Sequence, residues 1–262
     1  MAVAFALALH GGAGTIARGS DEAPYRAALL EALERGRATL AGGGSALDAV
    51  VATVVSLEDY PLFNAGYGSV FTADAAHELD AGVMDGRSLA AGAVIGVRTI
   101  RNPVLAAREV LRDGRSVLLG AEGAERWART KCLELVEPSY FSTPQRLAQL
   151  RAVQALAQDK AMLDHDGAAA ADESSQRTGT VGAVARDREG HLAAATSTGG
   201  LTNKMPGRIG DTPIVGAGVY ANDATLRRVV DGNRRAFHSR LHCLRRARAD
   251  ALSRSRRDAS RR

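Results

Sequence analysis

The pair Gly179-Thr180 offers the most reactive chemistry in this sequence. A threonine hydroxyl is a weak nucleophile unless a base takes its proton. If the peptide bond before Thr180 is cut, the α-amino group of Thr180 becomes free, and its reference pKa of about 7.7–8.0 lets it act as that base near neutral pH. Glycine at position 179 tolerates the strained backbone that self-cleavage needs. On these two residues alone, the simpler interpretation is favoured: a β-branched residue that starts a strand.

Polar groups that could bind a small amphoteric substrate follow in the sequence. Thr196-Ser-Thr198 places three hydroxyls at the end of an expected strand. Arg208 could hold a carboxylate with two hydrogen bonds, and Asp211 could hold an ammonium group. Together they would recognise an α-amino acid. A surface ion pair within one loop explains Arg208 and Asp211 equally well.

Three further motifs are candidate binding sites. Asn64-Ala-Gly-Tyr-Gly68 could hold a hard cation through backbone carbonyls, although its composition favours a plain turn. Gly12-Ala-Gly14 loosely matches a dinucleotide-binding pattern, but Gly19 and Pro24 interrupt the helix that such a site requires. His238 and His242 have the spacing of metal ligands on a helix and lie beside Cys243, yet no fourth ligand is evident.

The elements that must position these residues follow from hydrophobic periodicity. The spacing predicts helices over about 24–40, 45–55, 103–112 and 143–158, with two or three helices filling roughly 103–160. Apolar runs predict strands over about 2–9, 79–84, 90–97, 181–186 and 192–196. The polar, alanine-rich stretch 161–178 predicts a mobile loop. This order of elements favours an α+β fold.

Composition excludes several protein classes. The chain has 262 residues, of which 45% are hydrophobic and 24% charged, as in ordinary globular proteins. No run of 18 apolar residues occurs, which excludes a membrane-spanning helix of that kind. Two cysteines cannot build a disulfide scaffold. The apolar start, residues 1–9, lacks a basic leader region and is interpreted as a strand, so a cytoplasmic location is expected.

The charge is unevenly distributed. Residues 225–262 contain 13 arginines, no lysine and three aspartates, a formal charge of +10. The whole chain carries +5, so residues 1–224 carry −5. The basic character therefore belongs to one segment and not to the body of the protein, which weakens its meaning as a sign of nucleic-acid binding.

Taken together, the motifs resemble the plant-type asparaginase and isoaspartyl peptidase family of N-terminal-nucleophile hydrolases. The resemblance runs in order across residues 1 to about 224 and is specific as a set. Its matching stretches are Leu9-His-Gly-Gly-Ala-Gly14, Gly44-Ser-Ala-Leu-Asp-Ala-Val50, Pro61–Gly68, Glu78–Gly86, Asn102-Pro103, Gly179–Val184, Thr196–Gly200, Asn203–Asp211 and Gly216–Asn222.

The resemblance implies a four-layer αββα sandwich and an autocleavage between Gly179 and Thr180. The α subunit would comprise residues 1–179, with a linker over about 161–178, and residues 180–224 would begin the β subunit. Thr180 would attack the side-chain amide of L-asparagine or the isopeptide bond of a β-aspartyl dipeptide.

The resemblance also assigns the surrounding residues. Thr198 would lie beside the nucleophile and tune it, and Asn64 would sit nearby. Arg208 would bind the α-carboxylate of the substrate and Asp211 its α-amine. A structural sodium ion would be ringed by backbone carbonyls of Leu57, Glu58, Tyr60, Phe63, Ala65 and Tyr67. The family also implies a homo-oligomer of αβ units, with no cofactor for the chemistry and no nucleic-acid or membrane partner.

The resemblance stops after Thr225. The family continues there with a Thr-Gly-x-Gly-Glu motif that supplies oxyanion-hole donors, and this motif is absent after Thr225. Losing one such donor typically costs about 10²–10³ in rate. The sandwich is therefore expected to be incomplete at the C-terminus. A reading-frame change near codon 225 is the favoured explanation of the arginine-rich segment 225–262. The alternative function is an uncleaved, inactive family member, with or without a basic tail that binds nucleic acid.

Overall fold

The computed structural model describes residues 5–12, 22–163, 179–224 and 226–229. Most of the expected loop over 161–178, the segment beyond residue 229 and the candidate metal ligands His238, His242 and Cys243 lie outside these residues. No described helix is long and apolar enough to cross a membrane.

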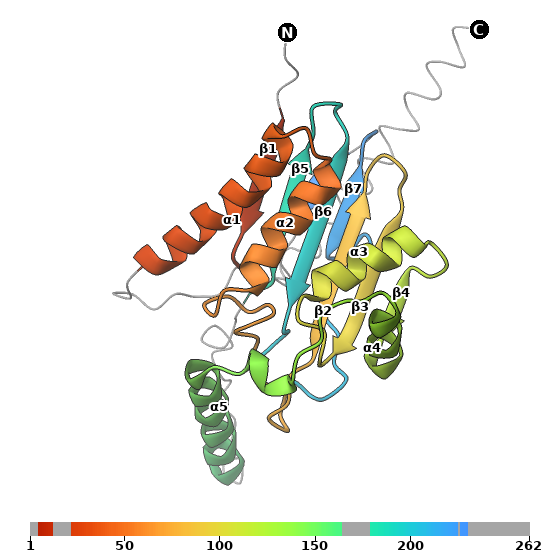
Figure 1. Ribbon diagram of the computed structural model, residues 1–262. Helices are drawn as coiled ribbons and strands as arrows, with labels where there is room; N and C mark the ends of the chain where they lie inside the picture. Colours follow the sequence, from red (N-terminus) through yellow and green to blue (C-terminus); the bar gives the residue numbers. More distant parts are fainter. Residues whose placement is uncertain (1–4, 13–21, 164–178, 225, 230–262) are drawn as a thin grey trace, which may run out of the picture.

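A six-stranded sheet forms the centre of the molecule (Figure 1). Its strands are β1 (Ala6–His10), β2 (Leu79–Asp85), β3 (Ala91–Val97), β4 (Leu118–Gly120), β5 (Val181–Arg186) and β6 (Leu192–Thr198). Their order across the sheet is β1-β5-β6-β2-β3-β4. Neighbouring strands are antiparallel except for the parallel pair β3 and β4. The two strands that follow Thr180 therefore lie between strands that precede it.

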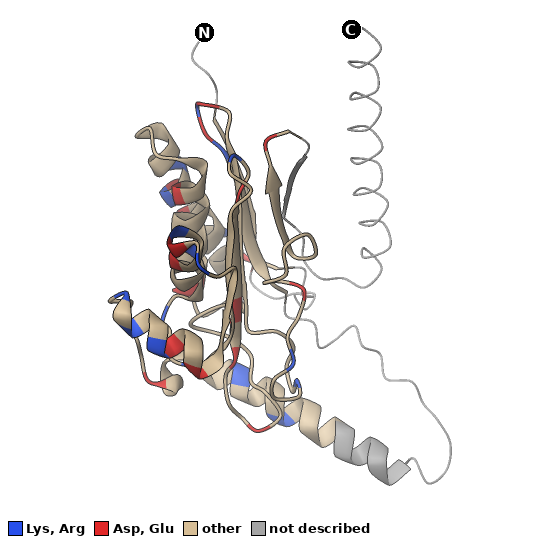
Figure 2. Cartoon of the chain, turned by 90° about the vertical axis from the view of Figure 1, so that its right-hand side faces the viewer, with Lys and Arg blue, Asp and Glu red and all other residues tan. Residues whose placement is uncertain are grey.

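Helices cover one face of this sheet (Figure 2). They are α1 (Ala23–Ala41), α2 (Ala46–Glu58), α3 (Pro103–Asp113) and α4 (Ala121–Thr130), while α5 (Pro144–Leu163) projects from one end of the sheet. A short 3₁₀ helix, η1, spans Pro138–Phe141. Helix α2 begins where the Ser45 hydroxyl accepts a hydrogen bond from the Asp48 N–H. The apolar positions of α2 join the main core with Ala81, Val83 and Ala183 of the sheet.

Small residues allow these layers to approach closely. All seven residues of β6 are buried, and six of them are alanine, serine or threonine. A Cβ added at Gly92 on β3 would lie 2.2 Å from the Ala107 carbonyl oxygen of α3, so this helix packs directly on the strand backbone. A strand that is buried on both faces must have covering elements on both sides.

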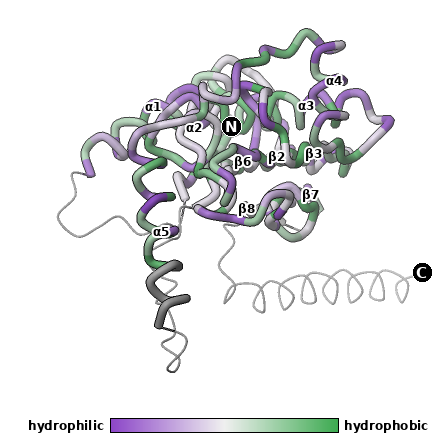
Figure 3. Tube along the Cα trace, turned by 90° about the horizontal axis from the view of Figure 1, so that it is seen from below, coloured by the Kyte–Doolittle hydropathy of each residue, from purple (hydrophilic) through white to green (hydrophobic). Residues whose placement is uncertain are grey.

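A β-hairpin covers part of the second face of the sheet (Figure 3). It consists of β7 (Val219–Asn222) and β8 (Leu226–Val229), which pair in an antiparallel manner. Val219 and Ala221 pack against Met84, Leu192 and Ala194 in a second, smaller core cluster. The described residues thus form a helical layer, a six-stranded sheet and a two-stranded sheet.

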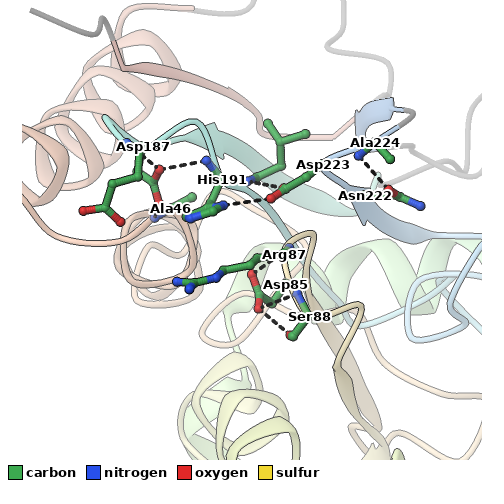
Figure 4. A network of polar contacts seen from close by, with 11 residues as sticks. Ala46, Asp85, Arg87, Ser88, Asp187, His191, Asn222, Asp223 and Ala224 are labelled. Carbon is green, nitrogen blue, oxygen red and sulfur yellow. Dashed lines mark hydrogen bonds and ion pairs between the residues drawn. The ribbon is translucent and has the colours of Figure 1, made fainter.

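Polar contacts fasten the end of β7 to the central sheet (Figure 4). One oxygen of Asp223 accepts a hydrogen bond from the Leu192 N–H at 2.9 Å, and the other contacts His191 Nδ1 at 2.8 Å. The Asp223 N–H donates to the Gly86 carbonyl at 3.0 Å. In the neighbouring β5–β6 turn, Asp187 accepts hydrogen bonds from the Glu189 and His191 N–H groups and from the Ala46 N–H at the start of α2.

The α+β prediction is confirmed, with three corrections at the level of elements. Residues 161–163, predicted as the start of a loop, continue helix α5. The first strand spans Ala6–His10, one residue beyond the predicted end. Strands β4, β7 and β8 were not predicted, because each has only three or four residues and lacks a clear alternation.

Candidate active site

Thr180 lies immediately before β5 and is buried, with 8% of its surface exposed. The preceding residue, Gly179, lies against the turn that follows β1. A Cβ added at Gly12 would come within 2.9 Å of the Gly179 carbonyl carbon and oxygen. Gly12 also has a φ of +112°, a backbone conformation that residues with a side chain rarely adopt. Glycine at position 12 therefore lets the backbone reach the peptide bond between Gly179 and Thr180.

The Thr180 hydroxyl lies 2.9 Å from the hydroxyl of Thr212. Thr212 belongs to the segment that precedes β7 and is buried. Its backbone carbonyl accepts a hydrogen bond from the Thr196 hydroxyl at 3.0 Å. A hydroxyl cluster of Thr180, Thr196 and Thr212 therefore lies between the central sheet and the hairpin segment. The sequence analysis singled out Thr180 and the 196–198 run but missed Thr212.

Thr198 ends β6 on the same face of the sheet. Strands β5 and β6 pair Val181 with Ser197, and continuing this register by one step places Thr180 opposite Thr198. The Thr198 hydroxyl accepts a hydrogen bond from the Gly200 N–H at 3.0 Å. The register therefore directs Thr198 toward the start of β5, and its role beside the nucleophile stays a prediction.

Asn64 reaches this region from the loop that follows α2. Its side-chain NH₂ group donates to the Gly200 carbonyl at 2.7 Å, and its side-chain oxygen accepts from the Val70 N–H at 3.0 Å. The Asn64 carbonyl accepts a hydrogen bond from the Gly199 N–H at 3.1 Å. Asn64 and Thr198 are therefore both tied to the short segment Gly199-Gly200.

The two predicted substrate-binding residues lie in the loop between β6 and β7. Arg208 is half-buried, and its Nη1 atom lies 3.4 Å from the position that a Cβ at Gly200 would take. Gly200 thus contacts the segments that carry Thr198, Asn64 and Arg208. Asp211 is also half-buried. It directly precedes Thr212, the residue whose hydroxyl contacts Thr180.

A buried charged cluster beside Arg208 was missed by the sequence analysis. The Lys204 ammonium group donates to the Glu78 carbonyl at 2.8 Å, and the Glu78 carboxylate accepts from Arg98 and from the Gly207 N–H. Asp80, which pairs with Thr198 across the sheet, accepts a hydrogen bond from the Gly96 N–H.

Burial governs the protonation of this cluster. It lowers the pKa of Lys204 and raises the pKa of Asp80. Burial also raises the pKa of Glu78, but hydrogen bonds from Arg98 and Gly207 outweigh it and leave that pKa below its ordinary value. The only signal of this cluster in the sequence is the pair of acidic residues Glu78 and Asp80 at the start of the expected strand over 79–84.

Two glycine backbones lie close to backbone carbonyls in the loop over residues 57–68. A Cβ at Gly66 would lie 2.4 Å from the Glu58 carbonyl oxygen, and one at Gly68 would lie 2.8 Å from that of Phe63. Arg146 of α5, a buried residue that the sequence analysis missed, donates to the Gly68 and Leu62 carbonyls at 2.6 and 3.2 Å. The loop therefore gathers neutral, hard oxygen donors.

The Glu58 side chain has a separate structural role. It is fully buried, and one of its oxygens accepts a hydrogen bond from the Val104 N–H in the first turn of α3 at 3.0 Å. Burial raises the pKa of Glu58 to about 8, and its hydrogen bonds oppose that rise only in part. Among the described residues, no three His, Cys, Asp or Glu side chains gather in a group that could hold a metal ion.

Comparison with known proteins shows the family of the chain. The model of the asparaginase family matches residues 3–226. An isoaspartyl peptidase of Salmonella typhimurium is 53% identical over 224 residues, which cover 84% of this chain and 70% of that protein. The isoaspartyl peptidase of Escherichia coli is also 53% identical, with 84% and 68% covered. An isoaspartyl peptidase/L-asparaginase of Xenopus laevis is 42% identical, with 83% and 66% covered. The matched segment contains every site residue named in this section, and the chain belongs to the asparaginase family.

Proposed function

We propose that this chain is a threonine-type amidohydrolase that cleaves itself before Thr180 and then hydrolyses L-asparagine and β-aspartyl dipeptides. The observation that carries the proposal is the position of Thr180. Its hydroxyl is buried within a hydroxyl cluster, and the preceding peptide is held against Gly12. The relatives named isoaspartyl peptidase and isoaspartyl peptidase/L-asparaginase support the substrate class.

Maturation would begin with attack by the Thr180 hydroxyl oxygen on the Gly179 carbonyl carbon. The new C–O bond replaces the C–N bond, and the hydroxyl proton passes to the departing nitrogen. Water then hydrolyses the ester and leaves a Gly179 carboxylate and a free Thr180 α-amine. This amine would act as the base in later turnovers, because its pKa lies near neutral pH.

In turnover, Thr180 would attack the side-chain carbonyl carbon of asparagine or of the β-aspartyl linkage. The leaving group would be ammonia or the amine of the second residue, and water would release aspartate from the ester. Arg208 would hold the α-carboxylate through its planar guanidinium group, and Asp211 would hold the α-amine. Thr198 would lie beside the reacting oxygen, and Asn64 would position the Gly199-Gly200 segment.

We also propose a sodium ion in the loop over residues 57–68. Backbone carbonyl oxygens suit a hard cation, and the Gly66 and Gly68 backbones lie close to two of the proposed donors. The proposed donors are the carbonyls of Leu57, Glu58, Tyr60, Phe63, Ala65 and Tyr67. The ion would stiffen the loop that carries Asn64 and would take no part in bond making.

The finer architecture belongs to the same proposal. The β7–β8 hairpin would be the start of the second sheet of a four-layer αββα sandwich. Cleavage would divide the chain into an α subunit of residues 1–179 and a β subunit that begins at Thr180, and two such αβ units would assemble into a homo-oligomer.

The denatured intact mass of the purified chain, followed for several days at neutral pH, tests this proposal. We expect the 27.4 kDa chain to be replaced by two species that correspond to residues 1–179 and 180–262. Thr180→Ala should remain intact, and ammonia release from asparagine should follow the cleaved fraction. A single uncleaved species would contradict the proposal and favour the inactive family member.

A further inference from the structure

Thr212 presents a hydroxyl to the nucleophile from a different part of the chain. The two hydroxyl oxygens are 2.9 Å apart, a normal hydrogen-bond distance for O–H···O. Thr212 is 2% exposed, so water has little access to this contact. Nothing in the sequence pattern distinguishes Thr212 from an ordinary loop threonine, because 32 residues separate it from Thr180.

The surrounding backbone fixes the position of Thr212. Its carbonyl accepts the hydrogen bond from Thr196 of β6, and it also lies 3.4 Å from the position that a Cβ at Gly82 of β2 would take. On the other side, a Cβ at Gly218 would lie 2.5 Å from the Thr212 Cα atom. The hydroxyl is therefore held in place by the same sheet that carries Thr180.

The uncleaved chain needs such a group more than the cleaved chain does. Before cleavage the nitrogen of Thr180 belongs to a peptide bond and cannot serve as a base. The Thr180 oxygen nevertheless carries partial negative charge while its proton is being lost during attack on the Gly179 carbonyl carbon. A hydroxyl donor at hydrogen-bond distance stabilises that charge, and hydrogen bonds to a charged oxygen are about twice as strong as neutral ones.

We propose that Thr212 is a catalytic residue of the maturation step, whose hydroxyl donates a hydrogen bond to the Thr180 oxygen during attack on Gly179. The inference rests on the proposed function, because it concerns the same cleavage. Thr212 keeps its own proton throughout. The proton of the Thr180 hydroxyl passes to the departing nitrogen as the C–O bond forms and the C–N bond breaks.

The test compares cleavage rates of single variants at neutral pH by denatured intact mass. Thr212→Val keeps the shape of the side chain and removes the hydroxyl, and we expect it to slow cleavage about 10- to 100-fold. Thr212→Ser restores a hydroxyl and should cleave at close to the rate of the unaltered chain. Thr53→Val is the matched control, because Thr53 is a buried threonine on α2 whose hydroxyl bonds to the Ala49 carbonyl.

The outcomes distinguish the role of Thr212 from the proposed function. Slow cleavage of Thr212→Val, with normal cleavage of the serine and Thr53 variants and unchanged thermal unfolding, supports the role of Thr212. Cleavage of Thr212→Val at the rate of the unaltered chain overturns this inference and leaves the proposed function intact. Equal slowing of the Thr53 variant, or failure of serine to restore the rate, also overturns it. An unaltered chain that never cleaves overturns both proposals.

Discussion

At the scale of single residues, Gly12 shows how the absence of a side chain can serve chemistry. Its backbone has a positive φ, and its Cα atom faces the carbonyl of the peptide bond that is expected to break. An added methyl group would make this positive φ unfavourable for the backbone. It would also lie only 2.9 Å from backbone atoms of Gly179.

Gly12→Ala should therefore slow cleavage before Thr180, because the peptide must move to make room for the methyl group. Gly43→Ala is a matched control: Gly43 also has a positive φ, of +86°, but nothing lies within 4 Å of its added Cβ. The control should lower the free energy of unfolding by about 1–2 kcal/mol and leave the cleavage rate unchanged. Intact-mass time courses and denaturant unfolding measure both effects. Unchanged cleavage of Gly12→Ala would show that the contact is not important.

Burial in the folded protein alters the ionisation of Glu58. Its pKa is raised from 4.5 to about 8 by burial, so the folded protein keeps the proton that the unfolded chain releases. Between these two values the folded state binds more protons than the unfolded state, and stability falls as pH rises. Below pH 4.5 neither state is ionised at this group, and above about 8 the penalty is complete.

Glu58→Gln should remove this pH dependence, because glutamine cannot ionise and can still accept the hydrogen bond from Val104. In a Thr180→Ala background, which keeps the chain in one piece, the variant should gain stability relative to its parent between pH 5 and pH 8. The measurement is the free energy of unfolding in urea at both values. Parallel stability curves for variant and parent would contradict the elevated pKa.

At the scale of elements, the attachment of β7 to the central sheet depends on a few hydrogen bonds of Asp223. Asp223 accepts from Leu192 and His191, while its own N–H donates to Gly86 (Figure 4). These bonds join the hairpin segment to β6 and to the turn after β2. Because Thr212 lies in the segment that leads into β7, the same contact helps to place the hydroxyl beside Thr180.

Asp223→Ala should lower the free energy of unfolding by about 1–3 kcal/mol, since it leaves the partially buried Leu192 N–H without its acceptor. Asp223→Asn keeps an oxygen for that N–H and should lose less. Denaturant unfolding of both variants measures the difference. If alanine and asparagine are equally stable, the hydrogen bond to Leu192 contributes little to the attachment of β7.

The sequence predicted those elements whose periodicity spans several turns or alternations. Helix α2 and strands β2, β3, β5 and β6 agree with their predicted positions to within a few residues. Strands β4, β7 and β8 are too short for a periodic signal, and their pairing depends on distant partners. In the site, residue chemistry suggested Thr180, Arg208 and Asp211 as candidates, and the resemblance assigned their roles and those of Thr198 and Asn64. Thr212, Lys204 and Arg146 could not be predicted, because their importance comes from contacts between segments far apart in the chain.

At the scale of the whole molecule, the proposed cleavage does not separate two independent bodies. Strand β5 pairs with β1 on one side and with β6 on the other, and β6 pairs with β2. The strands after Thr180 are therefore bonded on both outer sides to strands that precede it. These ladders, together with the shared core, should hold the two fragments together after cleavage.

The cleaved protein should consequently behave as one particle in native buffer. Size-exclusion chromatography at neutral pH should give one peak that contains both fragments, at the elution volume of the uncleaved Thr180→Ala variant. Denaturant should be required to separate them. A native peak that contains residues 1–179 alone would contradict the interleaved order of the sheet.

This strand order also determines the order in which synthesis, folding and the proposed cleavage can occur. The surroundings of Thr180 are assembled from β1, β2 and the loop after α2 on one side of the cut, and from β6 and the Thr212 segment on the other. The reactive arrangement does not exist until synthesis has passed Thr212 and the later strands have inserted between the earlier ones. The proposed cleavage should therefore follow folding, and a chain whose synthesis stops before Thr212 should keep the peptide bond between Gly179 and Thr180 intact.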